Sequence, residues 1–155
     1  MSNERVSLFL KGELNWAQLV GISVDEAYAM AEIGFNLLTQ GRLEDAEKIF
    51  LGLVSMNPTD GYFHCVLGSI FGRQGRLEEA HKELQACVEL GYVDSQVFVN
   101  RAEIALKQGQ LYEALADLER VIESEPTNSP PAMRAQAMLQ TVMQSIQLAR
   151  AQKDA

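Results

Sequence analysis

Four side chains in this sequence could act as nucleophiles, bases or metal ligands, namely His64, Cys65, His81 and Cys87. A catalytic cysteine requires a base within hydrogen-bonding distance. His64 and Cys65 are neighbours in sequence, and neighbouring residues on a helix point about 100° apart, so they do not face one another as base and nucleophile. No Cys-x-x-Cys or His-x-x-x-His spacing is present for zinc. The sequence therefore predicts no enzyme active site, no metal site and no bound cofactor.

Carboxylates are numerous near residues 44–47 and 78–83, and their number alone invites interpretation as a metal site. Each group is expected to lie in the first turns of a helix, where acidic side chains complement the helix dipole. A solvated outer face is therefore predicted for them instead of a cation site. The residues concerned are Glu44, Asp45, Glu47, Glu78, Glu79 and Glu83.

The composition limits the class of protein. The chain has 155 residues, of which 47% are hydrophobic and 22% charged, as in an ordinary globular protein. Its net charge of −8 repels phosphates and anionic lipids, so a nucleic-acid partner is not expected. Two cysteines are too few for a disulfide framework. The N-terminal apolar run ends at Lys11, too early for a signal peptide, and no stretch approaches a membrane span. A cytoplasmic protein without stable membrane insertion is expected.

A repeat of 34 residues organises the middle of the chain. Three segments align without a gap from Gly41, Gly75 and Gly109, and their spacing is 75 − 41 = 34 and 109 − 75 = 34. Each segment has leucine two residues after the glycine and alanine five residues after it. The glycines fall between two apolar stretches, where a helix ends in a left-handed residue that glycine adopts at least cost. The alanines are expected where two helices cross closely.

Each repeat is therefore predicted to be a helix–turn–helix unit. Ser23 and Glu26 have the spacing of a capping box, and Asp60 and Asp94 are suited to cap later helices. The expected helices span residues 25–39, 43–56, 60–73, 77–90, 94–107 and 111–124.

The three units do not end or pack identically. Pro58 and Pro126 end the first and third units, because proline disfavours helix in the residue before it. The second unit ends instead at Gly91-Tyr92, without proline. The first helix of the third unit carries Arg101-Ala102 where the others carry an apolar residue and glycine. A thinner packing seam is predicted there.

The segment after the repeats is expected to cap their end. A stack of such units exposes an apolar face at each end. Ser129 and Pro130 are suited to begin a helix that runs to about residue 152. Its predicted exposed residues are glutamines 140, 144 and 147, and its predicted apolar face contains Met133, Ala137, Val142 and Ile146.

The N-terminal segment has two compatible interpretations. Residues 4–20 carry more apolar side chains than a disordered leader would, including Phe9, Leu10 and Trp16. They can form a helical cap on the first repeat, or an arm through which two copies dimerise, because an excess of apolar surface favours an interface.

The 34-residue period and the placement of its glycine, alanine and proline resemble the tetratricopeptide repeat over about residues 27–126. The family implies that Cys87 is a small buried hydrophobe, and that His81 lies on an outward, solvated face. The chain departs from the family at the fourth position of each unit, where tryptophan is favoured. The residues there are Met30, His64 and Phe98. We expect His64 to pack inside its unit as a structural residue.

This resemblance predicts an all-α fold, a right-handed superhelix of three tandem repeats in a single domain of residues 1–155. Its expected parts are an N-terminal helical region (1–24), three repeats (27–60, 61–94 and 95–128) and a C-terminal capping helix (129–152).

The resemblance also implies a concave groove lined by the first helices. Its aromatic and small residues suit an extended peptide with a few apolar anchors. Alternatively, Phe35 and Leu38 pack against the N-terminal helix. Ala31 and Phe35 stand where repeats that clamp chaperone C-termini carry lysine and asparagine, so that function is not expected. The implied groove residues are Tyr28, Ala31, Phe35, Leu38, Tyr62, Cys65, Ser69, Arg73, Val99, Glu103 and Leu106.

A narrower resemblance extends beyond the repeat positions. Gly21-Ile22-Ser23, Gly34-Phe35-Asn36, Asp45-Ala46-x-Lys48-Ile49-Phe50 and Phe98-x-x-x-Ala102-Glu103 are similar to the class II chaperones of bacterial type III secretion. That resemblance implies a bacterial cytoplasmic chaperone that binds hydrophobic translocator proteins through an extended, proline-containing segment. It also implies homodimerisation through the N-terminal region. The alternative is a general adaptor or scaffold of this repeat family in a multiprotein complex.

Overall fold

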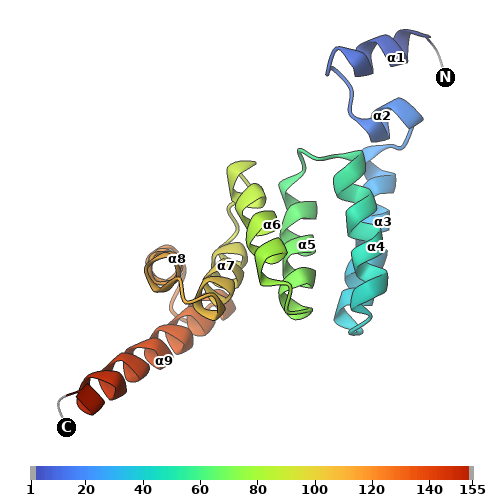
Figure 1. The fold of residues 1–155 in the computed structure, drawn as a ribbon. Helices are drawn as coiled ribbons and strands as arrows, with labels where there is room; N and C mark the ends of the chain where they lie inside the picture. The colour runs from blue at the N-terminus through green and yellow to red at the C-terminus, as the bar shows by residue number, and fades with distance from the viewer. Residues whose placement is uncertain (1–2, 154–155) are drawn as a thin grey trace. The chain divides into compact units, whose positions relative to one another are not determined.

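The regular structure of the chain is helical throughout the described part, residues 3–153 of a computed structural model (Figure 1). Residues 1–2 and 154–155, at the ends of the predicted domain, lie outside the described residues. The nine helices of the described part are α1 (Asn3–Leu10), α2 (Trp16–Val20), α3 (Val24–Thr39), α4 (Leu43–Met56), α5 (Gly61–Arg73), α6 (Leu77–Glu89), α7 (Ser95–Lys107), α8 (Leu111–Ser124) and α9 (Pro130–Lys153).

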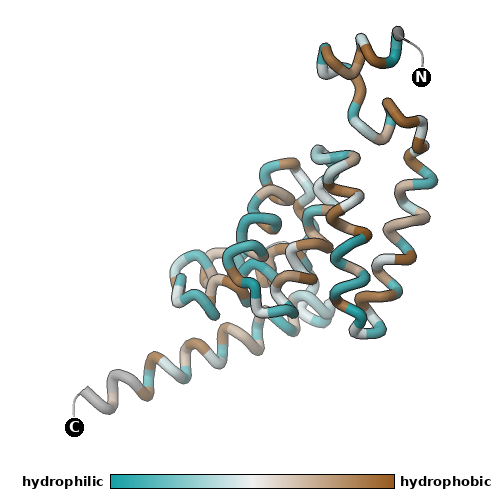
Figure 2. The backbone as a smooth tube through the Cα atoms, turned by 45° about the vertical axis from the view of Figure 1, so that its right-hand side comes forward, coloured by the Kyte–Doolittle hydropathy of each residue, from teal (hydrophilic) through white to brown (hydrophobic). Residues whose placement is uncertain are grey.

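The six central helices pack as three consecutive pairs, α3 with α4, α5 with α6 and α7 with α8. Their bounds agree with the sequence prediction to within one residue. The predicted all-α fold of helix–turn–helix repeats followed by a C-terminal helix is confirmed. Hydrophobic and hydrophilic residues alternate along the helices, as expected where each helix buries one stripe of its surface (Figure 2).

The repeat positions have the roles that their spacing predicts. Gly41, Gly75 and Gly109 lie between the paired helices with φ of +79°, +78° and +75°, the left-handed region that favours glycine. The alanines five residues later, at positions 46, 80 and 114, are fully buried. The predicted N-caps are also confirmed, since Ser23 forms a capping box with Glu26, and Asp60 and Asp94 cap α5 and α7.

Two compact units make up the chain, residues 1–92 and residues 93–155. In the first unit the largest fully buried side chains include Phe50, Phe63 and Ile70. In the second they include Leu118 and Val121. The single-domain organisation and its internal boundaries stay a prediction from the sequence.

The N-terminal helices meet the first repeat through α2. Asn15 caps α2, and its Nδ2 donates to Asn57 Oδ1 at 3.0 Å at the end of α4. Ala17 is buried, and α2 packs on α4. Among the described helices α1 contacts only α2, with the rings of Phe9 and Trp16 edge to face at 5.7 Å. Thus α2 covers part of the first repeat, and α1 extends beyond it.

The predicted face of the C-terminal helix is partly wrong. Ser129 caps α9 as expected, with its Oγ accepting from Ala132 N at 3.3 Å. However, Met133 is 58% exposed, and the buried residues of the first turns are Ala132 and Ala135. Apolar residues occur around most of this part of the helix, so the pattern does not indicate which face is buried. The small alanines are the buried residues because they allow the closest approach to α7 and α8. The glutamines are exposed as predicted.

Candidate functional site

A cavity of about 370 Å³ opens on the surface of the first unit, against α3 and α5. Its walls are aromatic and aliphatic apart from one carboxylate. The lining residues are Tyr28, Ala31, Glu32 and Phe35 of α3, Tyr62 of α5, and Tyr92 from the segment after α6. We call this cavity the aromatic pocket.

Rings in contact form one side of the aromatic pocket. Tyr28 and Tyr62 stack with their centroids 5.9 Å apart and their planes at 12°. Tyr62 contacts Tyr92 at 6.0 Å. Beneath them Tyr28 packs on Phe63 at 5.4 Å, and Phe63 packs on Phe50 at 6.5 Å. Phe50 and Phe63 are completely buried, so the pocket wall is fixed to the core of the unit.

Asp60 orients the tyrosine wall. Its Oδ2 accepts from Tyr28 Oη at 2.9 Å, while its Oδ1 accepts from Tyr62 N at 3.0 Å as the cap of α5. Burial raises the pKa of Tyr28, and the hydrogen bond and negative charge of Asp60 raise it further. Burial also raises the pKa of Tyr62, followed by the effects of Cys65 and Asp60. Both phenols are therefore neutral at physiological pH.

The pocket brings together four of the predicted groove residues, Tyr28, Ala31, Phe35 and Tyr62. Tyr28 is 44% and Phe35 45% exposed, so both rings present surface to solvent. The N-terminal helices do not cover Phe35, because neither described N-terminal helix contacts α3. Ala31 is 1% exposed and forms the floor.

The other predicted groove residues of the first unit lie outside this pocket. Cys65 and Ser69 follow Tyr62 along α5 and are half-buried, and Ser69 Oγ donates to Cys65 O at 3.0 Å. Leu38 is buried. Arg73 Nη1 donates to Leu38 O at 2.9 Å and so satisfies a carbonyl at the end of α3.

In the second unit the three predicted groove residues have separate surroundings. Val99 is completely buried. Leu106 lines an apolar cavity of about 440 Å³ with Leu111 and, from α9, Thr141, Val142, Ser145 and Ile146. Glu103 accepts from Lys107 Nζ at 2.8 Å and from Arg134 of α9. Burial alone would raise the pKa of Glu103, but these two cations outweigh it and lower the pKa. This carboxylate is therefore ionised and paired.

The histidine next to Cys65 has a structural role, as predicted. His64 is buried, with Nδ1 2.6 Å from Glu83 Oε2 and Nε2 2.9 Å from the Pro58 carbonyl oxygen. Cys87 is completely buried, as expected of a small hydrophobe. The prediction for His81 is wrong: it is half-buried, and its Nδ1 is enclosed without a hydrogen bond to any described residue. The adjacent Ala80 is fully buried where α5 and α6 cross, and His81 is partly covered with it.

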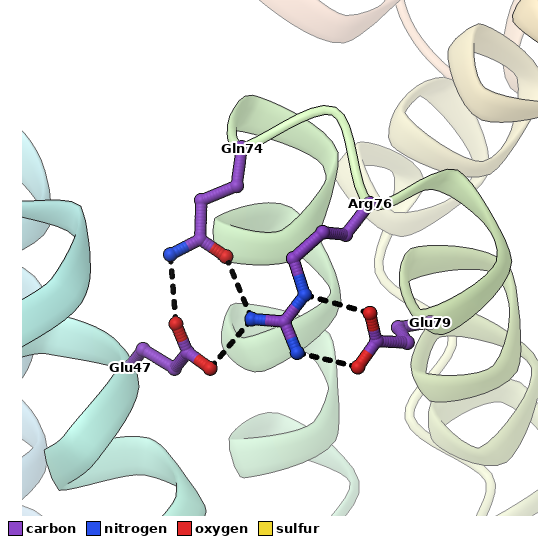
Figure 3. A network of polar contacts seen from close by, with 4 residues as sticks. All are labelled: Glu47, Gln74, Arg76 and Glu79. Carbon is purple, nitrogen blue, oxygen red and sulfur yellow. Dashed lines mark hydrogen bonds and ion pairs between the residues drawn. The ribbon is translucent and has the colours of Figure 1, made fainter.

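The prediction of a solvated acidic face is also wrong at two positions. Glu47 and Glu83 are each only 17% exposed. Glu47 of α4 accepts from Gln74 Nε2 at 2.7 Å and from Arg76 Nη1 at 2.6 Å, and Arg76 also binds Glu79 of α6 (Figure 3). These carboxylates join consecutive helices, and their partners were not recognisable from the acidic residues alone. Within residues 3–153, no group of three or more histidine, cysteine or acidic side chains could hold a metal ion.

Two pocket residues were missed by sequence reasoning. Glu32 lies on the same helix as Phe35 but not at a family groove position. Tyr92 lies between α6 and α7, where only the missing proline indicated that the residue was unusual. No helix between residues 3 and 153 is both long enough and apolar enough to cross a membrane.

The chain belongs to the tetratricopeptide-repeat family. Residues 33–86 and 65–132 match the model of that repeat, together more than half of the chain. No curated protein matches the sequence. Solved structures do match, and those that match over most of the chain include class II translocator chaperones of type III secretion.

Three solved structures illustrate the likeness. The translocator chaperone SycD of Yersinia enterocolitica is 25% identical, with a TM-score of 0.72 over 82% of this chain and 97% of SycD. PcrH of Pseudomonas aeruginosa, solved with the chaperone-binding region of PopD, is 26% identical, with a TM-score of 0.72 over 81% of this chain and 96% of PcrH. A chain of a type III secretion complex from Aeromonas hydrophila has the same fold, at 22% identity and a TM-score of 0.79 over 94% of this chain and 99% of that one.

Proposed function

We propose that this chain is a type III secretion chaperone that holds a hydrophobic translocator protein through an extended segment bound in its groove. The observation that carries the proposal is the match to SycD and to PcrH, the latter solved with a bound region of PopD. On this proposal the protein acts in the bacterial cytoplasm, without catalysis and without a cofactor.

The aromatic pocket has the chemistry that such a client requires. Tyr28, Phe35 and Tyr62 offer large, partly exposed rings, and Tyr28 is held in place by Asp60 and by the buried Phe63. Burial of an apolar client side chain against them contributes about 1.5–3 kcal/mol. Glu32 at the same pocket disfavours an acidic neighbour in the client.

The remaining groove assignments belong to the same proposal. Cys65 and Ser69 are small and continue along α5 from Tyr62, which allows the backbone of an extended peptide to approach. Glu103 supplies a paired, ionised group for polar client residues in the second unit. The buried Leu38 and Val99 contribute by supporting the groove from within.

We also propose a homodimer formed through the N-terminal helices. Leu10 is 78%, Trp16 48% and Val20 43% exposed in α1 and α2, and Val24 at the start of α3 is 67% exposed. An apolar surface of this kind indicates an interface.

Co-expression with each translocator of the source bacterium tests the proposed function. A translocator that aggregates alone should become soluble and co-purify with the wild-type chain. Phe35→Glu should abolish this rescue, because it introduces a charge into the aromatic pocket. Ile33→Glu is the matched control, since Ile33 lies on the same helix, is 58% exposed and does not line the pocket.

Two results would contradict the proposal. If no translocator is solubilised and other proteins are captured instead, the chain is an adaptor of a multiprotein complex. If Phe35→Glu rescues a translocator as well as wild type does, the client does not occupy the aromatic pocket.

A further inference from the structure

Tyr92 occupies the repeat position at which the other two units carry proline. The spacing is 92 − 58 = 34 from Pro58 and 126 − 92 = 34 to Pro126. Proline at this position has no side chain that could reach a neighbouring groove. In the second repeat the position instead supplies an aromatic ring to the pocket wall, 6.0 Å from Tyr62.

The backbone around Tyr92 is held in the geometry that directs this ring. Gly91 has φ of +82°, which reverses the chain at the end of α6. Tyr92 N donates to Cys87 O at 3.1 Å, and Cys87 Sγ donates to Tyr92 O at 3.4 Å. Because Cys87 is completely buried, the position of Tyr92 is tied to the core of the unit.

Gly61 is matched to Tyr92. A Cβ atom on Gly61 would lie 2.5 Å from Tyr92 Cβ and 3.2 Å from the Cys87 carbonyl oxygen, so no larger residue fits without displacing the tyrosine. The equivalent positions of the first and third repeats, 34 residues before and after, hold Ala27 and Ser95. Glycine is therefore present at this position only in the unit that has tyrosine in place of proline.

We propose that Tyr92 is a specificity-determining residue of the aromatic pocket, selecting a bulky apolar side chain of the bound segment. The inference rests on the proposed function, because it concerns the same groove. With Tyr92 as a wall, the cavity of about 370 Å³ encloses one large aliphatic or ring side chain on several sides. A small side chain does not reach the wall and gains little from it. Without the ring, large and small side chains differ less in the contact that they make.

A double-mutant cycle between protein and peptide tests this directly. The probe is the tightest-binding 15-residue peptide of the translocator that wild type solubilises, prepared with a fluorescent label and with each residue replaced in turn by alanine. Binding is measured by fluorescence anisotropy with the full chain. For wild type, alanine at one apolar position should weaken binding about 10-fold or more. For Tyr92→Ala, the same peptide change should cost less than about 3-fold.

Further variants distinguish loss of the Tyr92 ring from general damage to the fold. The quantity compared is the ratio of the Kd of the alanine-substituted peptide to the Kd of the unchanged peptide. Tyr92→Phe keeps the ring and should keep the wild-type ratio. Gly61→Ala displaces the ring while leaving it in the chain, and should reduce the ratio as Tyr92→Ala does. Should Tyr92→Ala fail to fold by circular dichroism, Tyr92→Leu retains apolar packing without a flat wall and replaces it in the cycle.

The outcomes distinguish this inference from the function on which it rests. If wild type solubilises no translocator, the proposed function fails and the inference fails with it. If wild type binds and every Tyr92 variant shows the same ratio at every peptide position, the inference alone is overturned. Loss of the ratio in Tyr92→Ala and Gly61→Ala but not in Tyr92→Phe supports it.

Discussion

The guanidinium of Arg101 and the carboxylate of Asp117 form a paired contact inside the second unit, with Nε and Nη2 each 2.7 Å from a different carboxylate oxygen. The two side chains are only 13% and 5% exposed. The pair joins α7 to α8 at the seam that the sequence predicted to be thin. The acid lies at 117 − 83 = 34 residues from Glu83, so the second and third repeats place a carboxylate at the same repeat position. The basic partners differ, being His64 in one and Arg101 in the other.

Removing one member of this pair should cost more than removing both. Asp117→Ala removes the paired carboxylate from the buried Arg101 charge, and should destabilise the chain by about 3–5 kcal/mol. Arg101→Leu with Asp117→Leu replaces the pair with apolar packing and should lie close to wild type. Urea unfolding followed by circular dichroism measures the difference. Equal destabilisation by the single and double changes would show that the two side chains stabilise the fold only through packing and not through their charges.

The glycines of the paired helices give a second stability test. A Cβ on Gly34 would lie 2.7 Å from a ring carbon of Phe50, and one on Gly68 would lie 2.8 Å from Leu84 Cγ. Gly34→Ala and Gly68→Ala should each destabilise by about 1–3 kcal/mol, because α3–α4 and α5–α6 are forced apart. Gly52→Ala is the control, since nothing lies within 4 Å of its Cβ position in α4. Gly52→Ala should stabilise the chain by about 0.5–1 kcal/mol. A lower melting temperature for Gly52→Ala than for Gly34→Ala and Gly68→Ala would contradict the packing described.

The fold was predictable because its positions recur. A glycine with positive φ and a buried alanine are required wherever two paired helices turn and cross, so three copies at one spacing define the element bounds. The pocket rings Tyr28, Phe35 and Tyr62 are among the groove residues that the same register predicts. In contrast, α9 lies outside the repeats, so no second copy of its pattern indicates which face is buried. Met133 was therefore predicted to lie on the buried face, where the structure has Ala132.

Polar contacts between helices were not predictable from the residue pattern. Arg101 and Glu47 are residue types that normally lie on the surface, and only three-dimensional neighbours show that each is shielded and paired. Tyr92 was missed for a related reason. The sequence shows that it replaces proline, but not that Gly61 leaves room for the ring to turn toward Tyr62.

Glu47 should give the protein a pH-dependent contribution to stability. Hydrogen bonds from Gln74 and then from Arg76 lower the pKa of Glu47 below its usual 4.5. A lowered pKa in the folded chain means that the contribution is fully present above about pH 4.5 and is lost as the pH falls through the folded-state value. Glu47→Gln should therefore destabilise by about 1 kcal/mol at neutral pH, with a difference that shrinks in acid.

Urea unfolding of wild type and Glu47→Gln at a series of pH values from neutral to acid measures this difference. Glu44→Gln serves as the control, because Glu44 is exposed on the first turn of the same helix. It should change stability little at any pH. A difference for Glu47→Gln that grows as the pH falls would contradict the role assigned to the network in Figure 3.

The proposed homodimer predicts a change in mass when the N-terminal apolar surface receives a charge. Leu10→Asp and Val20→Asp each place a carboxylate among residues that an interface would remove from water, where an unpaired charge is strongly unfavourable. Size-exclusion chromatography with light scattering should give the mass of two chains for wild type and of one chain for these variants. Tyr112→Asp is the matched control, because Tyr112 is 90% exposed on α8 and should leave the dimer intact. A wild-type chain that is already monomeric, or a Leu10→Asp variant that stays dimeric, would show that these helices do not form the interface.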